Sequence, residues 1–326
     1  MKDQIIAKKI LNWYDLNKRS LPWRKNVSQS KKHYYTLVSE FMLQQTQVVT
    51  VIPYFNRFIN KIPNLKKLST IQDRELIKLW EGLGYYSRVR NLKKTAKIII
   101  SKYNGKIPNN YEDLISLPGI GNYTANAILA IAFNKSYIPL DGNIERVLKR
   151  YLYLRKDNEI QKDNLIQKKT IFGISSRASD YAQALMELGA MICKPKNPEC
   201  SGCPIPKSCR SYKKKDFDLA KITKKNKEKY FILKVYKKNQ KYLLVKNTRF
   251  NFLKNLAIFP MEELSNPKNF NENLNFKMSN MNMNIKIEYL KNVKRFPSSY
   301  WFDKRKLDNY MLPTFTKKVV KYLEKN

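Results

Sequence analysis

The stretch LPGIG at residues 117–121 lies between YEDLIS at residues 111–116 and NYTANAILAIAF at residues 122–133, two runs with the composition of helices. Gly119 and Gly121 allow a hairpin in which successive backbone N–H groups point to one side and can hold a phosphate. The positive end of the following helix dipole would lie at the same place. An ordinary tight turn between two helices is the alternative. The stretch therefore predicts a hairpin that either connects helices or binds a phosphate.

Downstream of this hairpin the chain holds four cysteines, which are all the cysteine it has. They are Cys193, Cys200, Cys203 and Cys209, with the spacing C-x6-C-x2-C-x5-C. Four convergent thiolates suit a tetrahedral zinc ion or a [4Fe–4S] cluster, and the spacing alone leaves both open. Structural disulfides are the alternative, but a strongly cationic chain without a secretion signal is typical of the cytosol, where disulfides are rare. The cysteines therefore predict a metal centre.

The composition favours a soluble protein that binds a polyanion. At 326 residues the chain is long enough for two domains. Lysine and arginine outnumber aspartate and glutamate by 64 to 26, and the net charge of +38 makes nucleic acid the expected partner. No apolar run approaches the roughly 20 residues of a membrane span, and residues 1–16 lack the unbroken apolar core of a signal peptide. We therefore expect a cytoplasmic, nucleoid-associated protein without a membrane partner.

The hydrophobic pattern changes near residue 212. Before it, apolar residues recur at helical spacing between loops marked by proline or glycine. Residues 213–229 hold eight lysines and few apolar residues, which predicts an exposed basic linker. The run YFILKVYKKNQKYLLVKN at residues 230–247 has the pattern of a β-hairpin, and residues 316–326 have the pattern of a helix. This predicts a small α+β domain over residues 230–326.

Three acidic residues lie in apolar stretches, where a charge requires a partner or a function. They are Glu40 in SEFMLQQTQVVTVIPYF, Asp141 in PLDGNIERVLKR and Glu187 in ALMELGAMIC. Taken alone, Glu40 would be a solvated helix charge, and Asp141, just before a helix, would be its N-cap. All three carboxylates are therefore candidate functional residues, and Glu40 and Asp141 each have a simpler structural alternative.

Five stretches of the chain carry a family resemblance: SEFMLQQTQVVTVIPYF, WEGLGYYSRVRNL, SLPGIGNYTANAIL, PLDGNIERVL and ALMELGAMICKPKNPECSGCP. In this order they resemble the iron–sulfur helix–hairpin–helix DNA glycosylases, and most closely the MutY family of adenine DNA glycosylases. The match covers residues 10–212 and includes the family's cysteine spacing, which implies a [4Fe–4S] cluster. The resemblance implies an all-α glycosylase core over residues 1–212, with a six-helix barrel module at 27–135 and a cluster module made of 1–26 and 136–212.

The resemblance also implies a catalytic set. Glu40 would protonate the adenine leaving group and later position water, and Asp141, with Asn143 nearby, would stabilise the positive charge that develops on the deoxyribose. Breaking an N-glycosidic bond in this way needs one protonated and one ionised carboxyl group. Tyr123 would line the pocket and hydrogen-bond both carboxyl groups. Arg24 and Glu187 would complete the site.

A second set would contact DNA. The base must be flipped out of the duplex before cleavage, and Gln44 and Gln45 would fill the gap that it leaves. Tyr85 would wedge beside the opposite base. The hairpin would contribute Leu117, Gly119 and Gly121. The implied partner is double-stranded DNA with adenine mispaired to 8-oxoguanine (A:8-oxoG) or to guanine (A:G), bound by a monomer.

Position 123 separates this family from its relatives. Endonuclease III is similar in fold and cluster but has a lysine there, which forms a Schiff base and cleaves the strand. Tyr123 cannot form one, so the resemblance implies a monofunctional hydrolase that releases the base only. A mismatch thymine or uracil glycosylase is one alternative, because related pockets share similar carboxylates. A non-catalytic DNA-binding protein with an iron–sulfur cluster is another.

The C-terminal region matches less closely. Residues 230–265 resemble the start of the family's Nudix-like domain, which inspects the 8-oxoguanine opposite adenine. Its Phe-Ser-His loop is absent, and the nearest stretch, RFPSSYWF, has Ser298 and Ser299 but no histidine. The segment 266–300 is also short for the full set of strands. We therefore expect a shortened Nudix-like domain with a weak preference for 8-oxoguanine over guanine.

Overall fold

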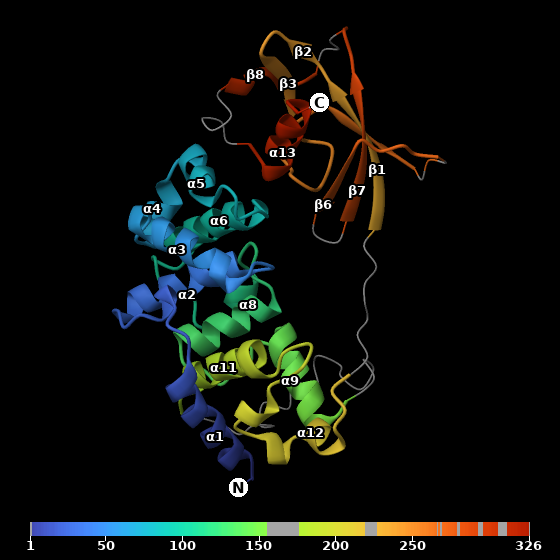
Figure 1. Cartoon of the computed structure of the whole chain (residues 1–326). Coiled ribbons are helices and arrows are strands. Elements are labelled where there is room, and N and C mark those ends of the chain that lie inside the picture. The colour runs from blue at the N-terminus through green and yellow to red at the C-terminus, as the bar shows by residue number, and fades with distance from the viewer. Residues whose placement is uncertain are drawn as a thin grey trace. The chain divides into compact units, whose positions relative to one another are not determined.

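The computed structural model describes residues 2–154, 176–218, 227–265, 267, 269–278, 281–292, 296–305 and 312–325. The chain divides into two compact units (Figure 1). The first holds Met1–Ile71 and Arg88–Lys221, and the second holds Gln72–Ser87 and Ile222–Asn326. Of the linker predicted at 213–229, residues 219–226 lie outside the described residues. The domain boundaries given above stay predictions.

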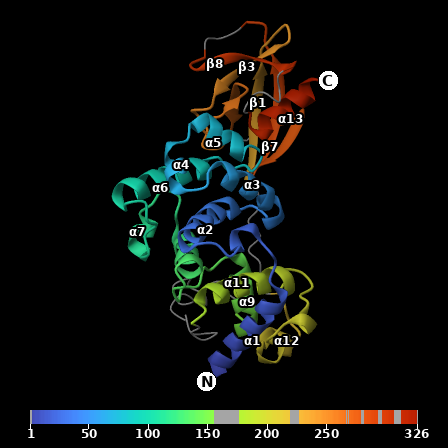
Figure 2. The ribbon, with the colours of Figure 1, turned by 90° about the vertical axis from the view of Figure 1, so that its left-hand side faces the viewer.

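The described part of the first unit is built from helices (Figures 1 and 2). They are α1 (Lys2–Asn17), η1 (Pro22–Arg24), α2 (Gln29–Leu43), α3 (Val48–Lys61), α4 (Leu65–Thr70), α6 (Ser87–Lys102), α7 (Tyr111–Ile115), α8 (Asn122–Ala127), η2 (Ile128–Ala132), α9 (Gly142–Leu152), α11 (Ala178–Glu187), η4 (Leu188–Ile192), η5 (Cys200–Gly202), η6 (Pro206–Ser208) and α12 (Arg210–Lys214). The helix made of α8 and the π-helical segment η2 is central, because residues 124–130 are all buried.

Apolar packing fixes the helices that carry the predicted catalytic residues. α2 and α11 contact η2, and α9 contacts α11. On α2, the buried residues Tyr34, Leu37, Val38 and Phe41 recur at the spacing of one helix face. On α9, the buried residues Ile144, Val147 and Leu148 likewise recur at the spacing of one helix face. Glu40 and Asp141 are therefore held by helices whose positions the core determines.

The hairpin at residues 117–121 joins α7 to α8 as a tight turn. Gly119 has a φ of 81°, in the left-handed region that favours glycine. A Cβ at this position would lie 2.8 Å from Cβ of Asn91 and 2.9 Å from Cε1 of Phe41. Both the backbone conformation and the close packing therefore require glycine here, and the predicted turn is confirmed.

A second apolar core lies beside the cysteines. It is formed by α1, α9 and α11 together with Ile205, and its buried members include Ile10, Tyr14, Ile144, Leu148 and Leu185. Cys193 and Cys203 pack against this cluster with part of their surface buried. The N-terminal helix and the cysteine loop, which are far apart in the sequence, thus share one core.

The described part of the second unit combines strands with helices at each end of its sequence. Its elements are α5 (Asp73–Trp80), β1 (Lys227–Val235), β2 (Lys237–Lys238), β3 (Lys241–Lys246), β4 (Ala257–Ile258), β5 (Met261–Leu264), β6 (Leu274–Met278), β7 (Met281–Tyr289), β8 (Ser299–Asp303) and α13 (Thr314–Leu323). One sheet has the order β5-β1-β7-β6, with β1 and β7 parallel. In the other sheet β3 pairs with β2, β4 and β8. The predicted C-terminal helix is confirmed as α13.

The hairpin predicted over residues 230–247 is confirmed around its turn, where β2 pairs antiparallel with β3, with Lys237 opposite Tyr242 and Lys238 opposite Lys241. The longer strand β1 before it has other partners. β1 pairs with β5 and β7, whereas β3 belongs to the other sheet. Phe231 and Leu233 of β1 and Tyr242 and Leu244 of β3 all enter one buried cluster. An alternating pattern defines the buried face of a strand but does not choose its partner. Among the described residues, no helix has the length and apolar character needed to span a membrane.

Candidate functional site

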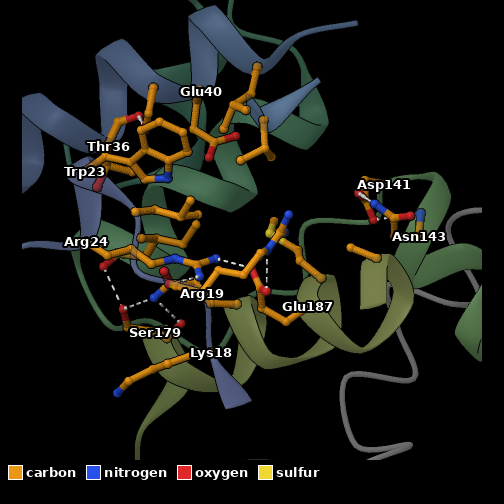
Figure 3. Close-up of a pocket in the computed structure, with 18 of the residues that line it drawn as sticks. Lys18, Arg19, Trp23, Arg24, Thr36, Glu40, Asp141, Asn143, Ser179 and Glu187 are labelled. Atoms are coloured by element: carbon orange, nitrogen blue, oxygen red, sulfur yellow. Dashed lines mark hydrogen bonds and ion pairs between the residues drawn. The ribbon is translucent and has the colours of Figure 1, made fainter. Parts of the chain in front are cut away.

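A cavity of about 740 Å³ lies in the first unit, bordered by α2, α8, the start of α9, α11 and the segment at residues 18–25 (Figure 3). The predicted site residues that line it are Arg24, Glu40, Tyr123, Asp141, Asn143 and Glu187. They come from distant parts of the sequence. The fold therefore brings the whole predicted catalytic set to one cavity.

Glu40 is buried in α2, with 4% of its surface exposed. Burial raises the pKa of its carboxyl group to about 7, and the negative charge of Asp141 adds to this rise. A hydrogen bond from the Tyr123 hydroxyl acts in the opposite direction and lowers the pKa. Its Oε2 has no hydrogen-bond partner among the described residues. The interpretation of Glu40 as a solvated helix charge is therefore wrong. A carboxyl group with this pKa holds a proton near neutral pH and can donate it.

Asp141 is the N-cap of α9, as its place before a helix predicts. Its Oδ1 accepts hydrogen bonds from the backbone N–H groups of Asn143 (3.0 Å) and Ile144 (2.7 Å), and its Oδ2 accepts one from the Asn143 side chain (3.0 Å). Burial raises the pKa of this carboxyl group, and the three donors oppose the rise. Because Asp141 also lines the cavity, it combines a structural cap with a position open to chemistry.

Arg146, which was not predicted from the sequence, supports this cap by binding the side chain of Asn143. Its Nη2 donates to Oδ1 of Asn143 (2.8 Å) and to the Gly189 carbonyl (2.6 Å). A Cβ at Gly189 would lie 2.6 Å from Cβ of Asn143, so the π-helical η4 and the start of α9 are in close contact. Arg146 in PLDGNIERVL shares one helix face with Asn143, and this spacing is the signal that could have identified it.

Glu187 is completely buried and paired with two arginines (Figure 3). Arg19 donates to its carboxylate from Nε (2.7 Å) and Nη2 (2.9 Å), and Nη2 of Arg24 lies 2.9 Å from Oε1. Removing a carboxylate from water is costly, and such charge pairing offsets the cost. Arg24 and Glu187 are predicted from the sequence, whereas Arg19 is not, although it lies close to Arg24 in RSLPWR.

Two further residues that line the cavity, Trp23 and Ser179, lie in no sequence pattern that predicts a place in the site. Trp23 forms an aromatic wall and packs edge-on against Phe55, with ring centroids 5.3 Å apart. Ser179 donates a hydrogen bond of 2.9 Å to the Ile131 carbonyl, which ties α11 to η2. These side chains are recognised only through the helix packing that places them here.

The predicted DNA contacts lie outside the cavity. Gln44 ends α2, and its Nε2 donates to the Gly119 carbonyl and to Oγ1 of Thr124, both at 3.3 Å. Gln45 is exposed and has a φ of 56°. Tyr85, in the second unit, is 40% exposed with a φ of 49°. Non-glycine residues rarely adopt such angles, and they do so mostly in turns and at functional sites.

The hairpin residues differ in exposure. Leu117 is 2% exposed, so its side chain anchors the hairpin in the core. Gly121 is exposed and is the N-cap of α8. Any contact of Leu117 with DNA would therefore come from its backbone, whereas Gly121 is open to a ligand.

The four cysteines form no disulfide with one another in this structure. Cys209 is the N-cap of α12, and its sulfur donates a hydrogen bond of 3.5 Å to the Arg150 carbonyl oxygen. Nη1 of Arg150 lies 3.5 Å from the sulfur of Cys193 and donates to the Lys194 carbonyl at 2.6 Å. Arg150 thus donates to the Cys193 sulfur, whereas burial raises the pKa of the Cys200, Cys203 and Cys209 thiols.

No group of three or more histidine, cysteine, aspartate or glutamate side chains in the described part of the chain is arranged to hold a metal ion. In a [4Fe–4S] cluster each thiolate binds a different iron atom, so the sulfurs stand farther apart than four ligands of one zinc ion. Cys193, Cys200, Cys203 and Cys209 interact electrostatically with one another. The donor set therefore fits a four-thiolate cluster in its chemistry.

Comparison with known proteins identifies relatives by sequence. The family model described as HhH-GPD superfamily base excision DNA repair protein matches residues 38–170. The chain is 43% identical over 269 residues to the adenine DNA glycosylase of Buchnera aphidicola subsp. Baizongia pistaciae, covering 80% of this chain and 74% of that one. It is 41% identical over 212 residues to the adenine DNA glycosylase of Rattus norvegicus, covering 63% of this chain and 41% of that one.

Solved structures show the same fold. A thermostable thymine-DNA glycosylase superimposes with a TM-score of 0.58 and 27% identity over 65% of this chain and 97% of that one. Endonuclease III in a non-covalent complex with DNA superimposes with a TM-score of 0.53 and 24% identity over 66% of this chain and 98% of that one. The second similarity shows the fold alone.

Proposed function

Because the chain belongs to the adenine DNA glycosylase family, we propose that it removes adenine from duplex DNA by hydrolysing the N-glycosidic bond. This membership confirms the family predicted from the five motifs. The helical unit has the HhH-GPD glycosylase fold. The enzyme is a DNA N-glycosylase of base excision repair, and the roles of its individual residues are proposed here.

The observation that carries the mechanism is that two carboxyl groups in different environments share one cavity. Glu40, with a pKa of about 7, would donate a proton to the departing adenine. Asp141, held by three hydrogen-bond donors, would stay ionised and stabilise the positive charge on the sugar. One protonated and one ionised carboxyl group are what cleavage of a glycosidic bond requires.

The remaining cavity residues would bind and orient the extruded base. Tyr123 would fix the Glu40 carboxyl group through its hydrogen bond. Glu187, held by Arg19 and Arg24, would present hydrogen-bonding groups of fixed direction to the base edge. Because position 123 is not lysine, the enzyme would release the base without forming a Schiff base with the sugar.

Two alternatives have less support. Relatives at 38–43% identity are adenine glycosylases, whereas the thymine-DNA glycosylase structure is 27% identical. A non-catalytic DNA-binding protein would have no reason to bury Glu40, because burial of a carboxyl group without a full set of partners costs stability. The buried, partly unpaired Glu40 thus favours an enzyme.

We propose double-stranded DNA with A:8-oxoG or A:G pairs as the substrate and a monomer as the active form. The hairpin at 117–121 would hold a backbone phosphate. Gln44 and Gln45 would fill the gap left by the extruded base, and Tyr85 would wedge beside the opposite base. The strand-containing unit would be the shortened Nudix-like domain that inspects the opposite base.

Cys193, Cys200, Cys203 and Cys209 would hold the [4Fe–4S] cluster implied by the family. The cluster supplies four iron–thiolate bonds that cross-link the loop when it is bound. The chain's own contribution would come from Arg150, whose Nη1 donates to the Cys193 sulfur at 3.5 Å. The cysteine loop would then act as a rigid support for the start of α9.

The test is strand-specific base release from A:8-oxoG, A:G, A:C and T:G duplexes under single-turnover conditions. We expect adenine release from the first two, strand breaks only after alkali, and no borohydride-trapped adduct. The Glu40→Gln variant is the control for contaminating activity. Release of thymine instead of adenine, or efficient borohydride trapping, would contradict the proposal.

A further inference from the structure

Arg88 is a buried arginine outside the cavity that holds the end of α2. It lies in the first turn of α6 and is 6% exposed. Its Nη1 donates hydrogen bonds to the carbonyl oxygens of Phe41 (3.1 Å), Met42 (2.6 Å) and Gln44 (2.6 Å). The last carbonyls of a helix have no partner within the helix, and a cation at this end also complements the helix dipole. Arg88 is therefore a cap supplied by another helix.

This cap sets the turn that follows α2. The chain reverses at Gln45, whose φ of 56° is unusual for a residue with a side chain. The Thr46 backbone N–H donates back to the Leu43 carbonyl at 3.1 Å. With the Gln44 carbonyl bound to Arg88, the side chain of Gln44 reaches the hairpin and donates to the Gly119 carbonyl at 3.3 Å. The turn and the hairpin are thus in direct contact.

The same face of α6 also holds the hairpin. Arg88, Asn91 and Thr95 recur at i, i+3 and i+7, which places them on one side of the helix. Oγ1 of Thr95 donates to the Pro118 carbonyl at 2.9 Å. Asn91 packs closely on Gly119: a Cβ added at Gly119 would lie only 2.8 Å from the Cβ of Asn91. One face of α6 therefore fixes both the turn after α2 and the hairpin.

We propose that Arg88 is a positioning residue that couples phosphate binding at the hairpin to base extrusion by the Gln44–Gln45 turn. The inference rests on the proposed glycosylase function. Extrusion requires the turn to enter the helix while the hairpin holds the backbone, so the spacing between them must be fixed. α6 fixes it through Arg88 on one side and through Asn91 and Thr95 on the other.

The experiment separates binding from extrusion in full-length protein that carries Glu40→Gln and so does not turn over. The probe is a duplex with 2-aminopurine in place of the target adenine, whose fluorescence rises on unstacking. Arg88→Met is compared with Lys97→Met, which removes the same charge from an exposed position on the same helix. Thermal melts show that each variant is folded, and Arg88→Lys tests whether charge alone suffices.

We expect Arg88→Met to bind the duplex within about threefold of Lys97→Met but to lose most of the extrusion signal. In protein that keeps Glu40 and so is active, Arg88→Met should slow base release by about 10²-fold. This is the effect of misplacing a positioned group by about 1 Å. Arg88→Lys should be intermediate, because an ammonium group is a point charge without the guanidinium fork. Extrusion by Arg88→Met equal to that of Lys97→Met would overturn the proposal.

A second variant keeps the proposal testable if Arg88→Met does not fold. Thr95→Val keeps the side-chain volume nearly constant but removes the hydroxyl that donates to the Pro118 carbonyl. This variant should lower both the extrusion signal and duplex binding. Unchanged extrusion in Thr95→Val would refute the coupling. If the wild-type enzyme extrudes 2-aminopurine but releases no adenine, the proposed function fails while the role of Arg88 is still measured.

Discussion

Nε of Arg146 donates a hydrogen bond of 2.7 Å to the carbonyl oxygen of Cys193. The same guanidinium group binds the Asn143 side chain, which in turn donates to Asp141. Two residues, Arg146 and Asn143, thus connect the first cysteine of the loop to the Asp141 carboxyl group in the cavity. The proposed cluster would then support catalysis through position, by keeping the Cys193 carbonyl where Arg146 needs it.

Arg146→Met should slow base release by about 10- to 100-fold, the range for losing an outer-shell partner, without loss of iron or duplex binding. The physical reason is that Asn143 loses the group that orients it toward Asp141. Lys149→Met, in the last turn of the same helix, is the matched control for charge. Single-turnover rates with iron content measured in parallel provide the check. An Arg146→Met rate equal to that of Lys149→Met would show that the connection has no functional role.

The rate of base release should fall as the pH rises through about 7, the pKa of Glu40. Only the protonated form can donate to adenine, so above this pH the rate should drop about tenfold per pH unit. Glu40→Gln should lose at least about 10²-fold, because an amide has no acidic proton. Single-turnover rates from pH 5 to 9 test this. A flat profile through neutral pH would assign the proton to another group.

The same pKa predicts a change in stability with pH. Folding raises the pKa of Glu40 from 4.5 to about 7, so the folded state binds this proton more tightly than the unfolded state. The contribution is fully present below pH 4.5 and is lost as the pH rises through about 7. Glu40→Gln should therefore melt at a higher temperature than the wild type at pH 8.5 and close to it at pH 4.5. The opposite order would mean that the ionised carboxylate is well solvated.

Asp141→Asn should lower the rate by about 10²- to 10³-fold, the range for removing one preorganised electrostatic stabiliser. Asparagine is as good an N-cap as aspartate, so the melting temperature should change little. Unfolding curves and single-turnover rates measured on the same preparation separate the two roles. A near wild-type rate would mean that Asp141 serves α9 only as a cap.

The sequence predicted the family, the helical region and six residues that line the cavity, Arg24, Glu40, Tyr123, Asp141, Asn143 and Glu187, because each depends on a local motif. It did not predict the partner of β1, since alternation in residues 230–247 is compatible with either sheet. Arg19 and Arg146 were missed for a different reason. Their partners, Glu187 and Cys193, lie far along the chain, and a buried ion pair or a cap is visible only once the helices are packed.

Purified protein should be yellow-brown and contain about four iron atoms per chain, with a broad absorbance shoulder near roughly 400 nm from thiolate-ligated iron. Cys200→Ser should lower the yield of soluble protein, because the loop loses one of its four cross-links. Lys207→Ser, an exposed change in the same segment, is the control. Stoichiometric zinc without iron in anaerobically prepared protein would contradict the cluster assignment.

Ser298 and Ser299 lie in the stretch that is nearest in sequence to the missing Phe-Ser-His loop. Both are exposed, but the Ser299 hydroxyl donates to the Phe296 carbonyl at 2.9 Å and so serves the turn itself. Ser298 has a φ of 55°, and its carbonyl accepts from the Lys246 N–H at 3.2 Å. Its hydroxyl has no hydrogen-bond partner within the described residues, so it is the one available to a base.

We therefore expect a modest preference for A:8-oxoG over A:G, and we expect Ser298→Ala to reduce it further. A base-specific contact is worth about 1–3 kcal/mol, so the ratio of single-turnover rates on the two duplexes should fall by about fivefold, the lower end of that range. Ser299→Ala is the matched control and should leave the ratio within about twofold of the wild type. Equal ratios in Ser298→Ala and the wild type, with a large preference in both, would place lesion recognition on other residues of the second unit.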